Sequence, residues 1–268
     1  MTRLDAALAA RGLARSRSHA ATLIAEGRVR IGDRAVIKAS TPVGDDDELR
    51  VDGADQYVSR AAQKLITALD GFGISPTGLL ALDMGASTGG FTQVLRERGA
   101  RRVLAVDVGH GQLAPQIAQD EGVVAVEGFN VRHMTPSTLA AATGEDTPPE
   151  IVTGDLSFIS LDYVLPATAA VAASSADIVL LIKPQFEVGR TAVRGGLVTD
   201  AATRIDAVER TLWSAWDAGL AVHGLLSSPI LGTHGNAEYL VHLRARLGTA
   251  AADPSEWTQR VTELVGGR

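Results

Sequence analysis

Short apolar runs alternate with amphipathic stretches over most of the chain. The runs predict buried strands of a parallel sheet, and the amphipathic stretches predict helices that cover it. The fold class is therefore α/β with a doubly wound sheet, whose ligands bind beyond the carboxyl ends of the strands. The predicted strands are residues 79–82, 103–106, 123–126, 151–153, 178–182, 220–226 and 238–243, and the predicted helices are 60–69, 91–98, 167–173 and 204–218.

The N-terminal part of the chain follows a separate pattern. A short helix over 4–10 is followed by a second helix that Ser16 or Ser18 can cap, and a hairpin pattern surrounds the Gly32-Asp33 turn. Such a small unit has an α+β composition and a small core. We expect a domain over 1–53, a polar linker over 54–58 and a second domain over 59–268.

The stretch LLALDMGASTGGFT, residues 79–92, joins a strand to a helix through a glycine-rich turn. The free N–H groups of such a helix start favour a ligand in the turn. Asp83 follows the strand, and Asp107 ends the next strand 24 positions later, where an acid can hold the hydroxyls of a ribose. The two acids and the spacing favour an adenosyl cofactor over a purely structural turn.

The amino-acid composition excludes several kinds of chemistry. The 268 residues include no cysteine, which excludes disulfides, a cysteine nucleophile and an iron–sulfur cluster. The six histidines lack the spacing of metal ligands, so we expect no metal site. Neither a signal-peptide core nor an apolar run of membrane-spanning length is present. We therefore expect a cytoplasmic protein without a membrane partner, and a monomer.

The net charge of −6 is unevenly distributed. Residues 1–38 carry eight cationic and three acidic side chains, a net charge of +5, so the remainder carries −11. A basic N-terminal domain followed by an acidic remainder of the chain indicates a separate nucleic-acid contact surface. The arginines that we expect to contact RNA are Arg3, Arg11, Arg15, Arg17, Arg28 and Arg30.

The order R-L-D-x-x-L, G-L-A-R-S-R-x-x-A and I-x-x-G-x-V-x-I in residues 3–31 resembles the S4 RNA-binding domain. The resemblance implies that the basic face of the second helix and the hairpin grips structured RNA. Phosphate contacts of this kind position the protein without reading sequence. The alternative is a solvated basic face with no partner.

The pattern D-x-G-x-x-x-G-G-F resembles the first motif of S-adenosylmethionine (SAM) methyltransferases. The strings GASTGGFT, DLSFISL, IKPQFEVG and GNAEY, together with the S4-like region, resemble the TlyA family of ribosomal RNA 2′-O-methyltransferases over nearly the whole chain. The resemblance implies a Rossmann-like, class I, FtsJ-like domain with SAM as cofactor. It also implies that ribosomal RNA or ribosomal subunits are the partners and that the product is a 2′-O-methylated cytidine.

The resemblance also implies residue roles. Lys64, Asp155, Lys183 and Glu238 match the Lys-Asp-Lys-Glu tetrad of FtsJ-like enzymes. Lys183 is the expected base, Lys64 and Glu238 orient the ribose, and Asp155 lies beside the methyl donor. A free lysine titrates near ~10.4, so a lysine base needs an environment that lowers its pKa. The expected cofactor contacts are Asp83, Gly85, Ala86, Ser87, Thr88, Gly89, Asp107, Asn130 and Asp155.

One stretch departs from the family pattern. The mycobacterial proteins carry an R-x-W-V element in the linker, where this chain reads Asp55-Gln56-Tyr57-Val58. Other functions also stay open from the residues alone. A small-molecule O-methyltransferase would share the cofactor site, an RNA-binding module would need no catalytic lysine, and a membrane-active haemolysin is a label that this family has carried.

Overall fold

The computed structural model describes residues 2–11, 13–14, 16–51, 57–189, 193, 195–232, 235–246 and 253–266. The chain divides into two compact units, Met1–Gln56 and Tyr57–Arg268. Tyr57 and Val58, the last two residues of the expected linker, pack within the larger unit, where the Val58 N–H donates to Gln93 Oε1 over 2.8 Å.

The smaller unit pairs two helices with short strands. Of the two serines that the sequence offers as caps, Ser16 caps the second helix by accepting a hydrogen bond from the His19 N–H over 3.1 Å. The apolar side chains of both helices form one core with those of the strands, and this core includes Leu8, Leu23 and Val29. The elements are β1 (Thr2–Arg3), α1 (Leu4–Ala10), α2 (Arg17–Ala25), β2 (Val29–Ile31), β3 (Arg34–Val36), β4 (Pro42–Val43) and β5 (Leu49–Val51).

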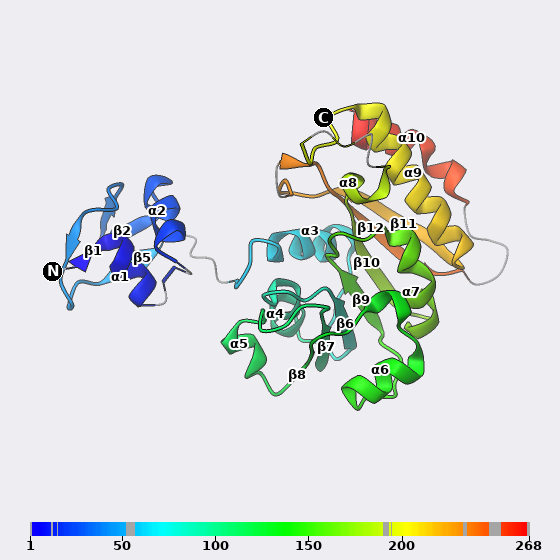
Figure 1. Cartoon of the computed structure of the whole chain (residues 1–268), viewed down its shortest axis with the longest axis horizontal. Coiled ribbons are helices and arrows are strands. Elements are labelled where there is room, and N and C mark those ends of the chain that lie inside the picture. The colour runs from blue at the N-terminus through cyan, green and yellow to red at the C-terminus, as the bar shows by residue number, and fades with distance from the viewer. Residues whose placement is uncertain are drawn as a thin grey trace. The chain divides into compact units, whose positions relative to one another are not determined.

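A seven-stranded sheet forms the centre of the larger unit (Figure 1). Its strand order is β11-β12-β10-β9-β6-β7-β8, and β12 runs antiparallel to its neighbours β10 and β11. The strands are β6 (Leu80–Met84), β7 (Arg102–Val106), β8 (Val123–Val126), β9 (Ile151–Gly154), β10 (Asp177–Ile182), β11 (Leu220–Ser227) and β12 (Tyr239–Ala245).

The chain winds in both directions from β6. It first adds β7 and β8 on one side and then returns to add β9 and β10 on the other. In such sheets the ligand crevice opens beyond the carboxyl ends of the strands where the winding reverses, here between β6 and β9. The doubly wound sheet predicted from the sequence is confirmed.

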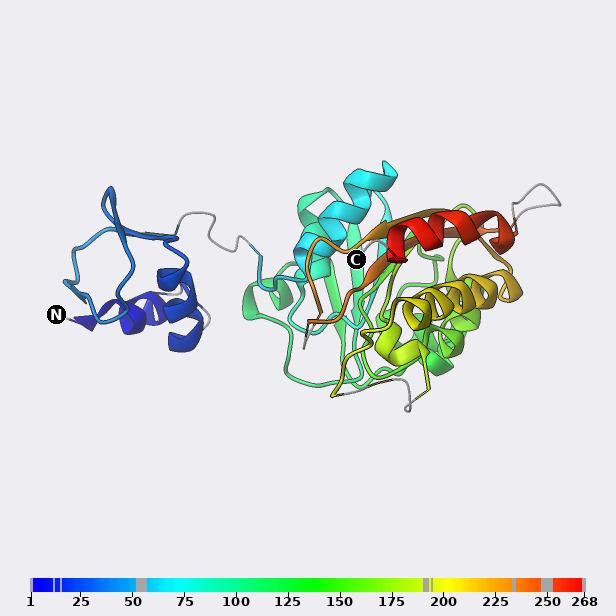
Figure 2. The ribbon, with the colours of Figure 1, turned by 90° about the horizontal axis from the view of Figure 1, so that it is seen from above.

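Helices cover both faces of the sheet, with α3 on one side and α9 on the other (Figures 1 and 2). The alternation along β6 produces both layers, because Leu80, Leu82 and Met84 face the α9 side while Ala81 faces the α3 side. The helices are α3 (Ala62–Phe72), α4 (Gly90–Glu97), α5 (Pro115–Ala118), α6 (Pro136–Thr143), α7 (Leu165–Val171), α8 (Pro184–Glu187), α9 (Ala201–Asp217) and α10 (Thr258–Gly266).

Asp83 lies inside the sheet, one residue before the end of β6, rather than closing the strand as we expected. Only 1% of it is exposed. Its carboxylate accepts hydrogen bonds from Thr92 Oγ1 over 2.7 Å and from Thr153 Oγ1 over 3.2 Å. These bonds connect β6 to α4 and to β9. Burial raises the pKa of Asp83 to about 7, against the effect of the two hydroxyl donors.

The raised pKa of Asp83 predicts a pH-dependent stability. Because the folded state binds this proton more tightly than the unfolded state, its contribution is fully present below the ordinary pKa of 3.8 and is lost as the pH rises through about 7. Asp83→Asn removes that titration. We expect the free energy of unfolding of the native protein to fall relative to that of the variant between pH 4 and 7, by at most about 1.4 kcal/mol per pH unit.

Urea unfolding at several pH values measures this difference. Asp206→Asn, at an exposed position of α9, is the control and should follow the native profile. Parallel profiles for Asp83→Asn and the native protein would contradict a buried, titrating Asp83.

Candidate active site

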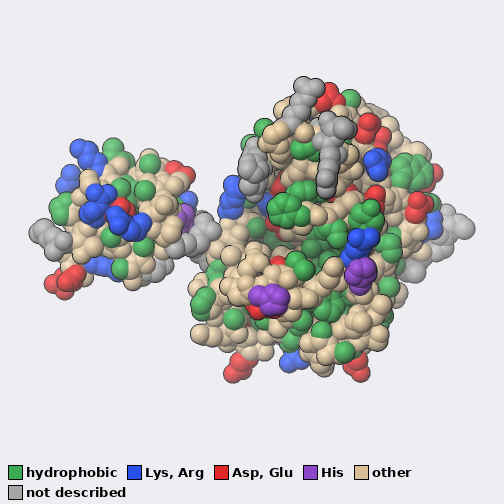
Figure 3. Space-filling model, viewed as in Figure 1, with side chains coloured by type: hydrophobic (Ala, Val, Ile, Leu, Met, Phe, Trp, Pro, Cys, Tyr) green, Lys and Arg blue, Asp and Glu red, His purple; other side chains and the backbone are tan. Residues whose placement is uncertain are grey.

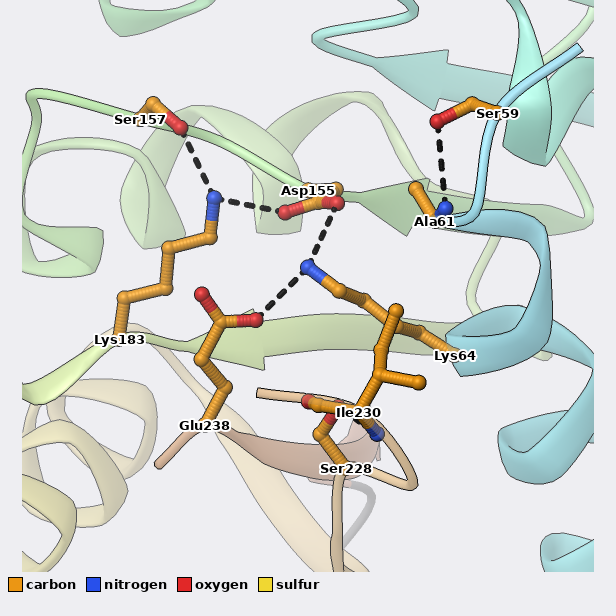
Figure 4. Close-up of polar contacts among 9 residues, drawn as sticks. All are labelled: Ser59, Ala61, Lys64, Asp155, Ser157, Lys183, Ser228, Ile230 and Glu238. Atoms are coloured by element: carbon orange, nitrogen blue, oxygen red, sulfur yellow. Dashed lines mark hydrogen bonds and ion pairs between the residues drawn. The ribbon is translucent and has the colours of Figure 1, made fainter. Parts of the chain in front are cut away.

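Four side chains that are far apart in the sequence meet at one edge of the sheet (Figure 4). Asp155 follows β9 directly and Lys183 follows β10 directly. Glu238 precedes β12, and because that strand is antiparallel, its beginning lies at the same edge as the end of β10. Lys64 reaches this edge from the first turns of α3. The topology therefore brings together the four residues that the sequence singled out.

The four side chains form a continuous ion network. The Lys64 ammonium lies 2.7 Å from Glu238 Oε2 and 3.1 Å from Asp155 Oδ2. The Lys183 ammonium lies 2.7 Å from Asp155 Oδ1 and donates to Ser157 Oγ over 2.8 Å. Lys64 thus faces two carboxylates, whereas Lys183 faces one carboxylate and one neutral hydroxyl.

This network is buried, with side-chain exposures between 2% for Glu238 and 15% for Asp155. Burial alone would raise the pKa of Asp155. The ammonium groups of Lys183 and Lys64 together have a larger, opposite effect, so the pKa of Asp155 lies below its usual value. Asp155 is therefore ionised at neutral pH. An isolated buried charge would be costly, and each of these has an opposite partner at contact distance.

Two cavities meet at this network. A cavity of about 220 Å³ is lined by the four network residues, by Arg60 and by the turn after β6. A second cavity of about 530 Å³ extends along the carboxyl ends of β6 and β7 and is lined by Asp107 and Asn130. The walls that the two cavities share are Gly85, Ser87, Asp155 and Ser157.

In the turn after β6, the backbone of Gly85 lies close to the segment after β9. Gly85 has a φ of +78°, and a Cβ there would lie 3.0 Å from Leu156 Cδ2. Asp107 fixes the turn from the neighbouring strand, because its carboxylate accepts from the Ser87 N–H over 2.8 Å and from the Gly109 N–H over 2.7 Å. A glycine turn, a strand-end acid and a cavity between them fit the adenosyl group that the sequence predicts.

The remaining predicted cofactor residues fall into three groups: some line the smaller cavity, one lines the larger cavity, and two line neither. Ala86 and Thr88 line the smaller cavity. Asn130 lines the larger one, and its side chain also accepts from the Arg132 N–H over 3.0 Å. Among the described lining residues of both cavities, Asp83 and Gly89 do not occur. Asp83 instead links the two elements that flank the turn, because it accepts a hydrogen bond from Thr92 of α4.

Four residues of the string DLSFISL line the larger cavity and were not predicted as site residues, namely Leu156, Ser157, Phe158 and Ile159. Ser157 lines both cavities and contacts the Lys183 ammonium. Phe158 lines the larger cavity, is 91% exposed and has a φ of +64°, a conformation that is uncommon for a bulky residue. Its ring lies 5.3 Å from that of Phe186. The one signal for them in the sequence is their position directly after the tetrad residue Asp155.

The predicted RNA-binding arginines belong to the smaller unit and bond within it. Asp5 pairs with two of them, and the guanidinium of Arg3 holds the pKa of Asp5 at about 2, with Arg17 also lowering it. Lys and Arg side chains gather on the face of this unit that Figure 3 shows. Arg11 donates to the carbonyls of Gly44 and Asp47, Arg28 pairs with Glu26, Arg30 donates to the Asp33 carbonyl, and Arg15 lies outside the described residues.

Comparison with known proteins matches this architecture. The model of the FtsJ-like methyltransferase family matches residues 57–245, and that of the S4 domain matches residues 2–49. The chain is 45% identical over 92% of its length to the 16S/23S rRNA (cytidine-2′-O)-methyltransferase TlyA of Mycobacterium tuberculosis, covering 91% of that protein. The chain belongs to the TlyA family.

Other relatives agree with the TlyA assignment. The chain is 39% identical to the candidate rRNA methyltransferase YqxC of Bacillus subtilis, over 90% of this chain and 85% of that protein. A solved structure described as a candidate hemolysin from Streptococcus thermophilus is 35% identical, with a TM-score of 0.75, and covers 98% of this chain and 94% of that one. The predicted S4 and FtsJ-like domains and the SAM-dependent methyltransferase class are confirmed.

The described residues also bear on the membrane and metal predictions. None of their helices combines the length and the apolar character that crossing a bilayer requires. Within the same residues, no group of three or more His, Asp or Glu side chains is arranged to hold a metal ion.

The ion network of this TlyA-family chain predicts that removing one of its charges strongly lowers the free energy of unfolding. Lys64→Met leaves Asp155 and Glu238 as buried carboxylates without the cation between them, so we expect a loss of about 3 kcal/mol in the free energy of unfolding at pH 8. The loss should be smaller at pH 5, because protonation of a carboxylate relieves the excess negative charge.

Urea unfolding at both pH values tests this expectation. Gln63→Met, one residue earlier on an exposed position of α3, is the matched control and should change the free energy of unfolding by less than about 0.5 kcal/mol. A loss for Lys64→Met as small as that of the control would show that the network does not need this charge.

Proposed function

We propose that this protein transfers the methyl group of SAM to the ribose 2′-hydroxyl of cytidine in ribosomal RNA of the small subunit, the large subunit or both. The observation that carries this proposal is the buried network of Lys64, Asp155, Lys183 and Glu238, which opens on a cavity that shares walls with a second, cofactor-sized one. The substrate is that named for the relative from M. tuberculosis.

The larger cavity is the proposed cofactor site. Its lining offers Asp107 for the ribose hydroxyls of SAM, Asn130 for the adenine end, and Gly85 and Ser87 of the turn after β6 for the methionine end. SAM bound there supplies an electrophilic methyl group on a sulfonium. Asp155 lies in the wall between the two cavities, which is where donor and acceptor must meet.

The smaller cavity is the proposed acceptor site. A ribose hydroxyl is a poor nucleophile until a base takes its proton. Lys64 is paired with two carboxylates, and it orients the ribose together with Glu238. Lys183 faces one carboxylate and the Ser157 hydroxyl, so it is the lysine better placed to act as base. Holding the hydroxyl in line behind the methyl group supplies the rest of the catalysis.

Contacts with the RNA extend beyond the ribose. The exposed ring of Phe158 lines the larger cavity and offers a flat surface on which a nucleobase can stack. Arginines of the smaller unit contact phosphates and position the RNA without reading its sequence. In this proposal the enzyme acts in the cytoplasm on ribosomal subunits, as a monomer and without a metal ion.

Lys183→Ala tests the assignment of the base. With labelled SAM and unmodified ribosomal subunits, we expect the native protein to place label in cytidine ribose, in a linkage that resists alkaline cleavage. The variant should lose at least about 100-fold in transfer rate, because general base catalysis contributes about 10²- to 10⁴-fold. Its SAM affinity, measured by calorimetry, should stay within about threefold of the native value, since Asp107 and Asn130 are unchanged.

Arg260→Ala, at an exposed position of α10, is the control for loss of a cation and should keep native activity. Label in a base rather than a ribose, or transfer by Lys183→Ala at the native rate, would contradict the proposal.

The role of the smaller unit predicts a change in salt dependence. In the double variant Arg28→Ala, Arg30→Ala, affinity for ribosomal RNA should fall similarly for all sequences. The slope of log affinity against log salt should become shallower by about 0.7–0.9 for each phosphate that the variant no longer neutralises. Filter binding at several potassium chloride concentrations measures both quantities. A slope equal to that of Arg260→Ala would argue against phosphate contacts at these positions.

A further inference from the structure

The segment Leu156–Leu161 is held at two points by side chains that lie on one short turn. Lys183 directly precedes α8, and Glu187 is the last residue of that helix, four positions later. The Lys183 ammonium bonds to Ser157 Oγ over 2.8 Å near the start of the segment. Glu187 accepts from Ser160 Oγ over 2.7 Å and from the Leu161 N–H over 3.1 Å at its end.

Glu187 is a costly residue to bury. It is 8% exposed, and burial raises the pKa of its carboxyl, although the Ser160 and Leu161 donors act in the opposite direction. Both carboxylate oxygens are used, and both bond to the segment after Asp155. A buried acid with two bonds to a single segment is poorly explained by general stabilisation, which an apolar side chain would supply at lower cost.

The segment that Glu187 holds carries two side chains of the proposed site. Ser157 contacts Lys183, and Phe158 points its ring outward from a backbone with a φ of +64°. Such a conformation costs free energy in a bulky residue and persists only where the surroundings enforce it. The bonds of Glu187 at Ser160 and Leu161, two and three residues after Phe158, are constraints of this kind.

We propose that Glu187 is a positioning residue, which fixes the segment Leu156–Leu161 so that Ser157 meets the Lys183 ammonium and Phe158 keeps its place in the wall of the larger cavity. The segment and α8 then form one unit in which the base and the groups that orient it keep a fixed geometry. Such geometry matters because a displacement of about 1 Å at a reacting group can cost about 100-fold in rate. This inference rests on the proposed function, in which Lys183 is the base.

Two substitutions separate positioning from mere stabilisation. Glu187→Ala removes both bonds, whereas Glu187→Gln keeps the shape and an acceptor oxygen. We expect Glu187→Ala to lower kcat by about 10- to 100-fold, with KM for RNA and the Kd of SAM within about twofold of native values. Glu187→Gln should restore kcat to within about threefold. Glu121→Ala, at an exposed position between α5 and β8, is the control and should keep native kinetics.

Hydrogen exchange provides a readout that needs no activity. In Glu187→Ala the amide of Leu161 loses its acceptor, so exchange across residues 156–161 should accelerate while exchange in the core strand β6 stays unchanged. If Glu187→Ala does not fold, Ser160→Ala removes one of the two bonds and should lower kcat and accelerate exchange to a smaller extent.

The outcomes are distinguishable. A folded Glu187→Ala with native kcat, or with native exchange across residues 156–161, would overturn the positioning role. A loss of kcat in Glu187→Gln equal to that in Glu187→Ala would also overturn it. If the native protein itself places no label in ribose, the proposed function fails, and the exchange measurement alone still decides whether Glu187 holds the segment.

Discussion

Pairing of buried charges at one edge of the sheet is the interaction on which the proposed site depends. Two ammonium groups and two carboxylates lie at contact distance, and the least exposed, Glu238, has 2% of its side chain accessible. Removing such groups from water is costly, and their mutual attraction returns that cost only when the geometry is good. The rest of the larger unit can be understood as the framework that maintains this geometry.

The framework comes from topology. Parallel strands β9 and β10 deliver Asp155 and Lys183 at their carboxyl ends, and the antiparallel β12 delivers Glu238 from the opposite chain direction. The same reversal of winding that opens the crevice beside β6 leaves room for the turn that Asp107 fixes. A single edge of the sheet thus holds the candidate cofactor cavity and the charged network, and they share the wall formed by Asp155.

Much of this could be predicted from the sequence, because buried strands and glycine turns have strong local patterns. The strands from β6 to β12 and the convergence of the four charged residues follow from those patterns and from the family resemblance. The position of Asp83 could not be predicted, because the two hydroxyls that hold it inside the sheet belong to α4 and β9. The short helix α8 and the contacts of Glu187 were also missed, since four residues carry too little periodicity to indicate a helix.

The proposed reaction requires that Lys183 meets the acceptor hydroxyl in the smaller cavity. The most direct test is an experimental structure of the protein with a SAM analogue that cannot transfer its methyl group and an RNA that contains the acceptor cytidine. We expect a ribose 2′-oxygen within about 2.6–3.2 Å of Lys183 Nζ, with Asp155 between the acceptor and the analogue. A ribose bound away from Lys183, or a base atom in its place, would contradict it.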